Sequence, residues 1–431
     1  MTEELVCLLG GEEVGRLRQV SGRTTFAYSG TWREDDEAYP LSLSMPLAAA
    51  EHGPAIVEAF LWGLLPDNER VLDRWAKRFQ VSARNAFGLI ANVGEDCAGA
   101  VQFVRPERLD EVLSGAADRV EWLDEKEIAE RLRLLREDHA AWRLPSDTGQ
   151  FSLSGAQPKT ALLLEGDRWG VPSGRLPTTH ILKPPTGQFD GHAENEHVCL
   201  ALARALGLPT ATSRVARFGE EIAIVVERYD RVRDGNDILR VHQEDACQAL
   251  GVPPTQKYQN EGGPSVATVV ELLRTHSSER AQDVSIFIDA IGFNWLIAGA
   301  DAHAKNYSLL LSGGPRVRLA PLYDVASILP YDRIDLHRAK LAMKIGNEYK
   351  LLNIRRRHWQ RLAEEVRIDP ERVFARLAEM AEQLPDAVRD IREAARREGL
   401  DQPVVERLEA RLVEWAKGCR RVLASPEHEA V

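Results

Sequence analysis

The residues best suited to chemistry stand in one short segment, which reads DAHAKN at positions 301–306. Protein kinases place an aspartate that orients the attacking hydroxyl five residues before an asparagine that binds Mg²⁺. Asp301 and Asn306 keep that spacing, and Asp324 follows a strand-like stretch, 317–323, as the second metal-binding aspartate of a kinase does. This order indicates phosphoryl transfer, which needs oxygen ligands on Mg²⁺ and a carboxylate facing the incoming alcohol.

A cation and a donor-rich loop for the phosphates are also expected, and both have candidates upstream. Lys183 ends a predicted strand, 180–183, as a phosphate-contacting lysine does. No Gly-x-Gly-x-x-Gly precedes this strand, but small residues let backbone N–H groups approach phosphate oxygens, and hydroxyls add donors. The segment 151–159 supplies small, hydroxyl and cationic residues of this kind: Ser152, Ser154, Gly155 and Lys159.

Each of these groups also has an interpretation without chemistry. The segment 301–306 could be a hydrogen-bonded loop, Asp324 could cap a helix, and Lys183 could be a solvated strand end. The Ser/Gly segment could be an ordinary turn between strands. The lysine, the two aspartates and the asparagine stand together in kinase order, and this joint occurrence favours the chemical interpretation.

Composition limits the class of protein. The chain has 431 residues, 44% hydrophobic and 28% charged, with a net charge of -11, which argues against a general nucleic-acid binder. Its five cysteines are dispersed without a Cys-x-x-Cys pair, and no signal peptide is evident, so we expect a cytoplasmic protein with reduced thiols. The apolar stretch 284–300 contains Asp289 and Asn294, so it predicts a buried helix and no membrane span.

The hydrophobic pattern predicts an α+β fold with a β-rich N-terminal half and an all-helical C-terminal lobe. Predicted strands are 5–9, 24–28, 159–164, 180–183 and 221–227. Predicted helices are 57–65, stopped by Pro66, a charged connector at 121–135, and 196–206 with Asn195 as its N-cap. We expect three parts: 1–108, a small sheet plus helix; 109–245, an N-lobe with the Ser/Gly loop; and 246–431, a helical C-lobe.

Several longer motifs together resemble one family. They are FSLSGAQPKT at 151–160, THILKP at 179–184, VERYDR at 226–231, QEDACQ at 243–248, DAHAKN at 301–306 and LYDV at 322–325. LSLSMP at 41–46 and GLLPDN at 63–68 add N-terminal matches. The chain resembles the HipA family, the kinase toxins of type II toxin–antitoxin modules.

The resemblance implies an atypical two-lobed protein-kinase-like fold that uses ATP and Mg²⁺. Asp301 would deprotonate the substrate hydroxyl, Asn306 and Asp324 would hold Mg²⁺, and Glu227 and Tyr229 would lie along the hinge near adenine. The implied nucleotide-contacting set is Ser152, Ser154, Gly155, Lys159, Lys183, Glu227, Tyr229, Gln243, His303, Asn306 and Asp324.

The resemblance also implies regulation and partners. Ser152 matches an autophosphorylated serine whose modification silences the kinase, and Ser154 offers a second acceptor. The implied partner is a HipB-like helix-turn-helix antitoxin dimer, which would carry the acidic toxin to operator DNA. Some relatives phosphorylate an aminoacyl-tRNA synthetase and induce dormancy. Two alternatives stay open: a non-catalytic ATP-binding regulatory subunit acting with the antitoxin on operator DNA, and a kinase acting on a small metabolite.

Overall fold

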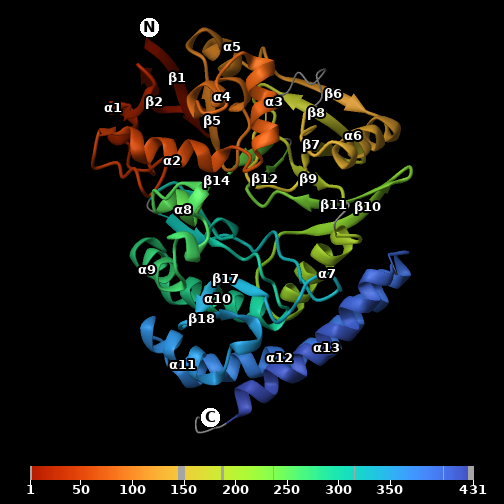
Figure 1. Ribbon diagram of the computed structural model, residues 1–431. Coiled ribbons are helices and arrows are strands. Elements are labelled where there is room, and N and C mark those ends of the chain that lie inside the picture. Colours follow the sequence, from red (N-terminus) through yellow and green to blue (C-terminus); the bar gives the residue numbers. More distant parts are fainter. Residues whose placement is uncertain are drawn as a thin grey trace. The chain divides into compact units, whose positions relative to one another are not determined.

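The computed structural model describes residues 2–143, 151–185, 189–235, 237–314, 316–400 and 402–425 (Figure 1). The chain divides into two compact units, each built from three separate stretches of sequence. The first unit comprises Met1–Pro184, Ala216–Thr255 and Ser308–Val317. The second unit comprises Pro185–Val215, Gln256–Tyr307 and Arg318–Val431. Sheets dominate the first unit and helices the second, so the α+β class is confirmed.

The first unit begins with an antiparallel sheet and the helices that pack against it. These elements are β1 (Thr2–Leu9), β2 (Glu12–Val20), β3 (Arg23–Tyr28), α1 (Gly30–Arg33), β4 (Glu51–His52), α2 (Pro54–Leu64), α3 (Glu69–Phe79), α4 (Ala86–Val93), β5 (Val101–Val104) and α5 (Leu109–Leu113). The strand order is β4-β3-β2-β1-β5. Alternation along β1 buries Leu5, Cys7 and Leu9 in the main core. As predicted, α2 ends just before Pro66.

A second sheet has the strand order β10-β11-β9-β7-β8-β6, and it belongs to the same unit except for the first three residues of β10, 213–215. Its elements are β6 (Arg119–Leu123), α6 (Glu125–Glu137), β7 (Thr160–Glu165), β8 (Arg168–Ser173), β9 (His180–Lys183), β10 (Ser213–Phe218) and β11 (Glu221–Glu227). The predicted helical connector at 121–135 is wrong at its start, because residues up to Leu123 pair with β8. The helix begins only after Asp124, which forms a capping box with Glu127.

The rest of the first unit consists of short strands and one helical turn. They are β12 (Arg231–Asp234), β13 (Asp237–Arg240), β14 (His242–Asp245), α8 (Ala246–Ala249), β15 (Ser308–Ser312) and β16 (Arg316–Leu319). β12 and β13 form a hairpin, and β14, β15 and β16 form a three-stranded sheet. The predicted strand 317–323 is therefore too long at its C-terminal end, since β16 ends at Leu319.

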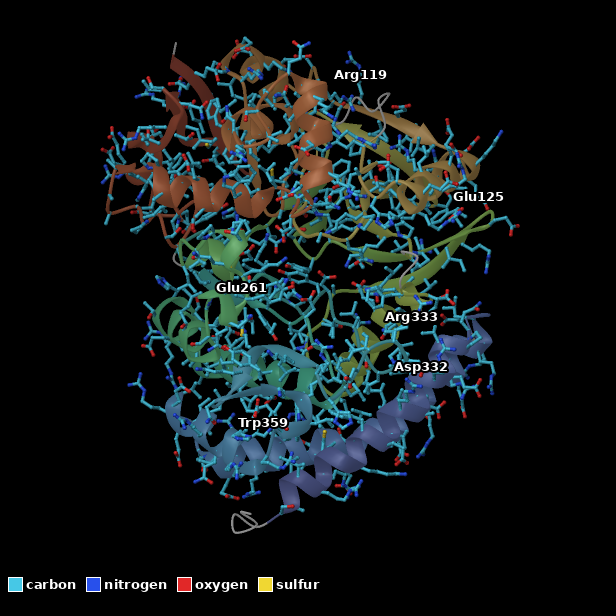
Figure 2. All side chains as sticks on the ribbon, in the orientation of Figure 1. Arg119, Glu125, Glu261, Asp332, Arg333 and Trp359 are labelled. Atoms are coloured by element: carbon cyan, nitrogen blue, oxygen red, sulfur yellow. The ribbon has the colours of Figure 1, made fainter. Side chains whose placement is uncertain are left out.

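The second unit is mostly helical. Its elements are α7 (His192–Ala205), α9 (Val266–His276), α10 (Arg280–Leu296), β17 (Lys340–Ile345), β18 (Glu348–Lys350), α11 (Arg356–Glu365), α12 (Pro370–Arg397) and α13 (Pro403–Ala424). The long helices α12 and α13 run alongside each other (Figure 1). Trp359 of α11 is buried against Trp295 of α10, with ring centroids 5.4 Å apart, and Figure 2 marks its place. This packing fixes α10, the predicted buried helix.

Two predictions about this unit need correction. The lobe is not all-helical, because β17 and β18 form an antiparallel hairpin. The helix predicted at 196–206 begins earlier, at His192, after Gly191 in the left-handed conformation (φ 68°). Asn195 is therefore not an N-cap. It lies inside α7, and its amide donates to the Ser327 carbonyl (2.7 Å), a tertiary hydrogen bond that no local pattern reveals. Within the described residues, no helix is long and apolar enough to cross a membrane.

Candidate active site

The loop after α10 brings Asp301 and Asn306 together. The His303 N–H donates to the Asp301 carbonyl (2.8 Å), and the Asn306 N–H donates to the His303 carbonyl (2.9 Å). The loop then forms the 3₁₀ turn η4 (Ala304–Asn306). The Asn306 side-chain amide also donates to the Asp301 carbonyl, at 3.0 Å. This bond engages the amide nitrogen, so the amide oxygen is the Asn306 side-chain atom that could bind a metal.

The charges of Asp301 and Asp324 both act on the imidazole of His303. Burial lowers the pKa of His303 to about 4, while Asp301 and Asp324 act in the opposite direction and Lys257 and Lys305 reinforce the fall. The imidazole is therefore neutral at pH 7. Both aspartate charges act on this one ring, so the structure brings the two carboxylates into one neighbourhood. The Nδ1 atom of His303 is buried and has no hydrogen-bond partner among the described residues.

Asp324 has a backbone conformation that is unusual for an aspartate. Its φ is 57°, in the left-handed region that non-glycine residues rarely adopt. Such a conformation costs about 1 kcal/mol or more, and residues held in this way cluster at functional sites. The surrounding chain imposes it: the Leu322 carbonyl accepts from the Ala211 N–H, and the Tyr323 hydroxyl donates to the Lys305 carbonyl (2.8 and 2.7 Å). Asp324 is thus fixed relative to the 301–306 loop.

The donors of this neighbourhood fit Mg²⁺. Asn306 and Asp324 offer an amide and a carboxylate oxygen, the ligand types that Mg²⁺ prefers. No group of three or more His, Cys, Asp or Glu side chains that could hold a metal occurs within the described part of the chain. Magnesium in kinases is bound through one or two protein oxygens together with substrate phosphates and waters. The residues therefore suit a nucleotide-bound Mg²⁺ better than a site made by the protein alone.

Tyr258 is a site residue that the sequence prediction missed. Its hydroxyl donates to Asp301 Oδ1 at 2.7 Å, and its ring meets the His303 imidazole edge-on with centroids 5.0 Å apart. The available signal was the Gly262-Gly263 pair shortly after it, which marks a tight turn. A turn signal does not say which distant residue the turn will contact.

In the first unit, the Ser/Gly segment is an anchored loop. Ser152 is fully buried; its hydroxyl donates to the Leu64 carbonyl (2.7 Å) and its N–H to the Asp96 carbonyl (2.9 Å). Gly155 has φ 100°, where a side chain would be strained, and a Cβ there would lie 2.6 Å from the Lys159 ammonium. That ammonium donates to the Ser154 carbonyl and lies 5.2 Å from the Trp142 ring centroid.

The remaining predicted nucleotide contacts also belong to the first unit. Lys183 is buried at the end of β9, opposite Ile224 of β11. The Tyr229 hydroxyl donates to the Gln243 side-chain oxygen, so the structure brings these two residues together. Glu227 ends β11 with an exposed side chain. Asp301, His303, Asn306 and Asp324 belong to the second unit.

A buried ionic network supports the segment that carries Tyr229. Asp230 accepts from the Arg228 guanidinium (2.8 and 3.0 Å), and Arg231 pairs with both Asp230 and Asp96 (3.0 Å each). Burial alone would raise the pKa of Asp230, but Arg228 and Arg231 lower it to about 2. The Gln243 amide donates to Asp230 Oδ2 at 3.1 Å, which ties the network to the Tyr229–Gln243 pair.

Comparison with known proteins identifies the family. A family model described as HipA-like C-terminal domain matches residues 151–388, and one described as HipA N-terminal domain matches residues 5–104. Y4mE of Sinorhizobium fredii is 38% identical over 384 residues, covering 88% of this chain and 89% of Y4mE. The serine/threonine-protein kinase toxin HipA of Shewanella oneidensis is 29% identical over 400 residues, covering 89% of this chain and 88% of that toxin.

A solved structure is similar over almost the full length. It is a complex of HipA, HipB and operator DNA from the Shewanella oneidensis toxin–antitoxin system, and its matching chain has 26% identity and a TM-score of 0.78. The match covers 97% of this chain and 99% of that chain. The chain therefore belongs to the HipA family of serine/threonine-protein kinase toxins.

Proposed function

We propose that this chain is an ATP- and Mg²⁺-dependent serine/threonine-protein kinase and the toxin of a type II toxin–antitoxin module. The observation that supports the proposal is the set of hydrogen bonds around the 301–306 loop: Asn306 donates to the Asp301 carbonyl, and Tyr323, the residue before Asp324, donates to the Lys305 carbonyl. Phosphoryl transfer is catalysed almost entirely by positioning and electrostatics, so a rigid set of oxygen donors is the feature to expect.

In the proposed reaction, Asp301 accepts the proton of a serine or threonine hydroxyl. The hydroxyl oxygen then bonds to the γ-phosphorus of ATP, the bond to the bridging oxygen breaks, and ADP leaves with that electron pair. Asn306 and Asp324 would hold the Mg²⁺, which would offset the negative charge of the β- and γ-phosphates. Lys183 and the Ser/Gly segment would contact the phosphates, His303 would contribute from the 301–306 loop, and Tyr229, Glu227 and Gln243 would bind the rest of the nucleotide.

We further propose autophosphorylation on Ser152 or Ser154. The Ser152 hydroxyl is buried on the Leu64 carbonyl, so this serine would have to leave its place before it could accept a phosphate. Ser154 is half-buried and needs less rearrangement. A phosphate would add about -1.5 to -2 charge to the segment that is proposed to hold ATP phosphates, and repulsion would oppose nucleotide binding. The modification would therefore silence the kinase.

The proposed partner is a helix-turn-helix antitoxin dimer. Support comes from the solved relative, in which HipA is in complex with HipB and operator DNA. With a net charge of -11, this chain would gain DNA affinity through a basic partner, because neutralisation of phosphates dominates binding to DNA. We propose a cytoplasmic location, a protein substrate linked to translation such as an aminoacyl-tRNA synthetase, and a three-part division of the chain at residues 108 and 245.

Phosphopeptide mass spectrometry tests the proposal. Cell lysate is incubated with ATP, Mg²⁺ and wild-type, Asp301→Asn or Asp386→Asn protein; Asp386 is an exposed aspartate of α12 and serves as the matched control. Wild type and Asp386→Asn should place phosphate on Ser152 or Ser154 and on a protein target, and Asp301→Asn should not. Equal labelling by all three proteins would contradict the proposal. ATP binding without any phosphate transfer by wild type would favour the regulatory-subunit alternative.

A further inference from the structure

A hydrogen bond to the proposed catalytic base comes from outside the catalytic loop. The Tyr258 hydroxyl donates to Asp301 Oδ1 at 2.7 Å. Asp301 has two carboxylate oxygens, and a donor on Oδ1 restricts rotation of the group about its Cβ–Cγ bond. Oδ2 is then the oxygen left to receive a proton. A charge-assisted bond of this kind is about twice as strong as one between neutral groups.

The ring of Tyr258 has two further neighbours. It packs edge-on against His303, at an interplanar angle of 85°, and the Lys257 ammonium lies 5.6 Å from its centroid. The Lys257 carbonyl accepts a hydrogen bond from the Ala304 N–H at 3.4 Å. The backbone before Tyr258 and the loop that contains Asp301 are thus joined directly, so the phenol and the carboxylate keep a fixed relation.

Backbone hydrogen bonds and two glycines define the turn that follows Tyr258. The Tyr258 carbonyl accepts from both Glu261 N–H and Gly263 N–H at 3.0 Å, across the short turn η3 (Gln259–Glu261). Gly262 has φ 92°, and a Cβ on Gly263 would lie only 2.0 Å from the Gln256 carbonyl oxygen. Only glycine fits at these two positions while the turn keeps its shape.

A second anchor fixes this turn to the hairpin of the same unit. The Gln259 side-chain oxygen accepts from the Lys344 N–H of β17 at 2.9 Å. The turn is therefore attached at one end to the catalytic loop and at the other to a strand.

We propose that Tyr258 is a positioning residue for phosphoryl transfer. Its hydroxyl holds the Asp301 carboxylate in the rotamer in which Oδ2 faces the substrate hydroxyl and takes its proton. The inference rests on the proposed kinase function, since it concerns the geometry of the same reaction. Tyr258 contacts neither the nucleotide nor the substrate in this account and acts only through Asp301.

The test compares Tyr258→Phe with wild type in full-length protein. This substitution removes one oxygen and keeps the ring that packs on His303. Tyr349→Phe is the matched control, because Tyr349 is a half-buried tyrosine of β18 in the same unit. We would measure initial rates of phosphate transfer against ATP concentration, together with the thermal midpoint of each protein.

If Tyr258 positions the base, Tyr258→Phe should lower kcat by about tenfold, with KM for ATP within about twofold of wild type and an unchanged thermal midpoint. Tyr349→Phe should match wild type. A kcat within twofold of wild type, or a loss that comes with a lower thermal midpoint and a raised KM, would overturn the positioning role alone. No transfer by wild type would overturn the proposed function, and this inference with it.

Discussion

The ionic network around Asp230 permits a quantitative prediction. The Asp230 and Arg228 side chains are each only 2% exposed; Asp230 accepts from Arg228, the Gly99 N–H (2.7 Å) and Gln243, and forms an ion pair with Arg231. Asp230→Asn keeps the shape of the side chain but removes the charge between two arginines. It also turns an amide N–H₂ toward groups that are themselves donors. Arg228 would then lose its nearest counter-charge, and Arg231 would keep only its pair with Asp96.

The expected cost follows from this geometry. Breaking a buried ion pair by removing one partner destabilises a protein by about 3–5 kcal/mol, because the remaining charge stays buried without compensation. A unit of this size shifts its thermal midpoint by roughly 2–4 °C for each kcal/mol, so Asp230→Asn should lower that midpoint by roughly 6–20 °C. The matched control is Asp234→Asn, an exposed aspartate of the β12–β13 hairpin, which should change stability by less than about 0.5 kcal/mol.

Differential scanning calorimetry on the full chain measures the midpoints, and hydrogen exchange followed by mass spectrometry shows which unit opens. Two units need not unfold in one transition, so the exchange data assign the shift. Peptides covering 216–255 should lose protection in Asp230→Asn and keep it in Asp234→Asn. A midpoint within about 2 °C of wild type, or equal effects of the two substitutions, would refute the view that the network stabilises the first unit.

Three further predictions concern other contacts. Burial raises the pKa of Glu244 to about 8, above its value in the unfolded chain. The stability of the folded wild type therefore falls as pH rises from about 4.5 to 8. Glu244→Gln lacks this titration, so its thermal midpoint relative to wild type should rise between about pH 6 and about pH 9. Gly15→Ala would place a Cβ 2.3 Å from the Ala27 carbonyl oxygen and should cost about 1–3 kcal/mol in a denaturant titration, while Gly30→Ala, with open space around it, should not. Lys183→Met should weaken ATP binding about tenfold or more in calorimetric titration with Mg²⁺, and an affinity equal to wild type would contradict the assigned contact.

Sequence signals that act over a few residues predicted the strands and helices whose bounds depend on neighbouring residues. The strand 180–183 and the end of α2 before Pro66 are confirmed, because alternation and proline act within a few residues. The start of α6 was missed although Asp124 and Glu127 form a capping box, a signal readable in the sequence. Trp122 and Leu123 were assigned to the helix because their pairing with β8 lies far along the chain.

The candidate site was predictable to the extent that its residues stand in one order along the chain. The spacing of Asp301, Asn306 and Asp324 is a pattern of the sequence, and in the structure Asn306 donates to the Asp301 carbonyl while Tyr323, next to Asp324, donates to the Lys305 carbonyl. Tyr258 was not predictable, since its contact with Asp301 joins residues from two loops. The Asp96–Arg231 ion pair was not predictable either, because the sequence does not show which distant charged residues pair in a core.

In the proposed mechanism, Asp301 acts in the transfer step and takes no part in holding the nucleotide. Single-turnover transfer of phosphate from ATP, measured together with ATP affinity on the same preparations, tests it most directly. Asp301→Asn should slow transfer by at least about a hundredfold while ATP affinity stays within about threefold of wild type, and Asp386→Asn should change neither. Transfer by Asp301→Asn at the wild-type rate would contradict the account.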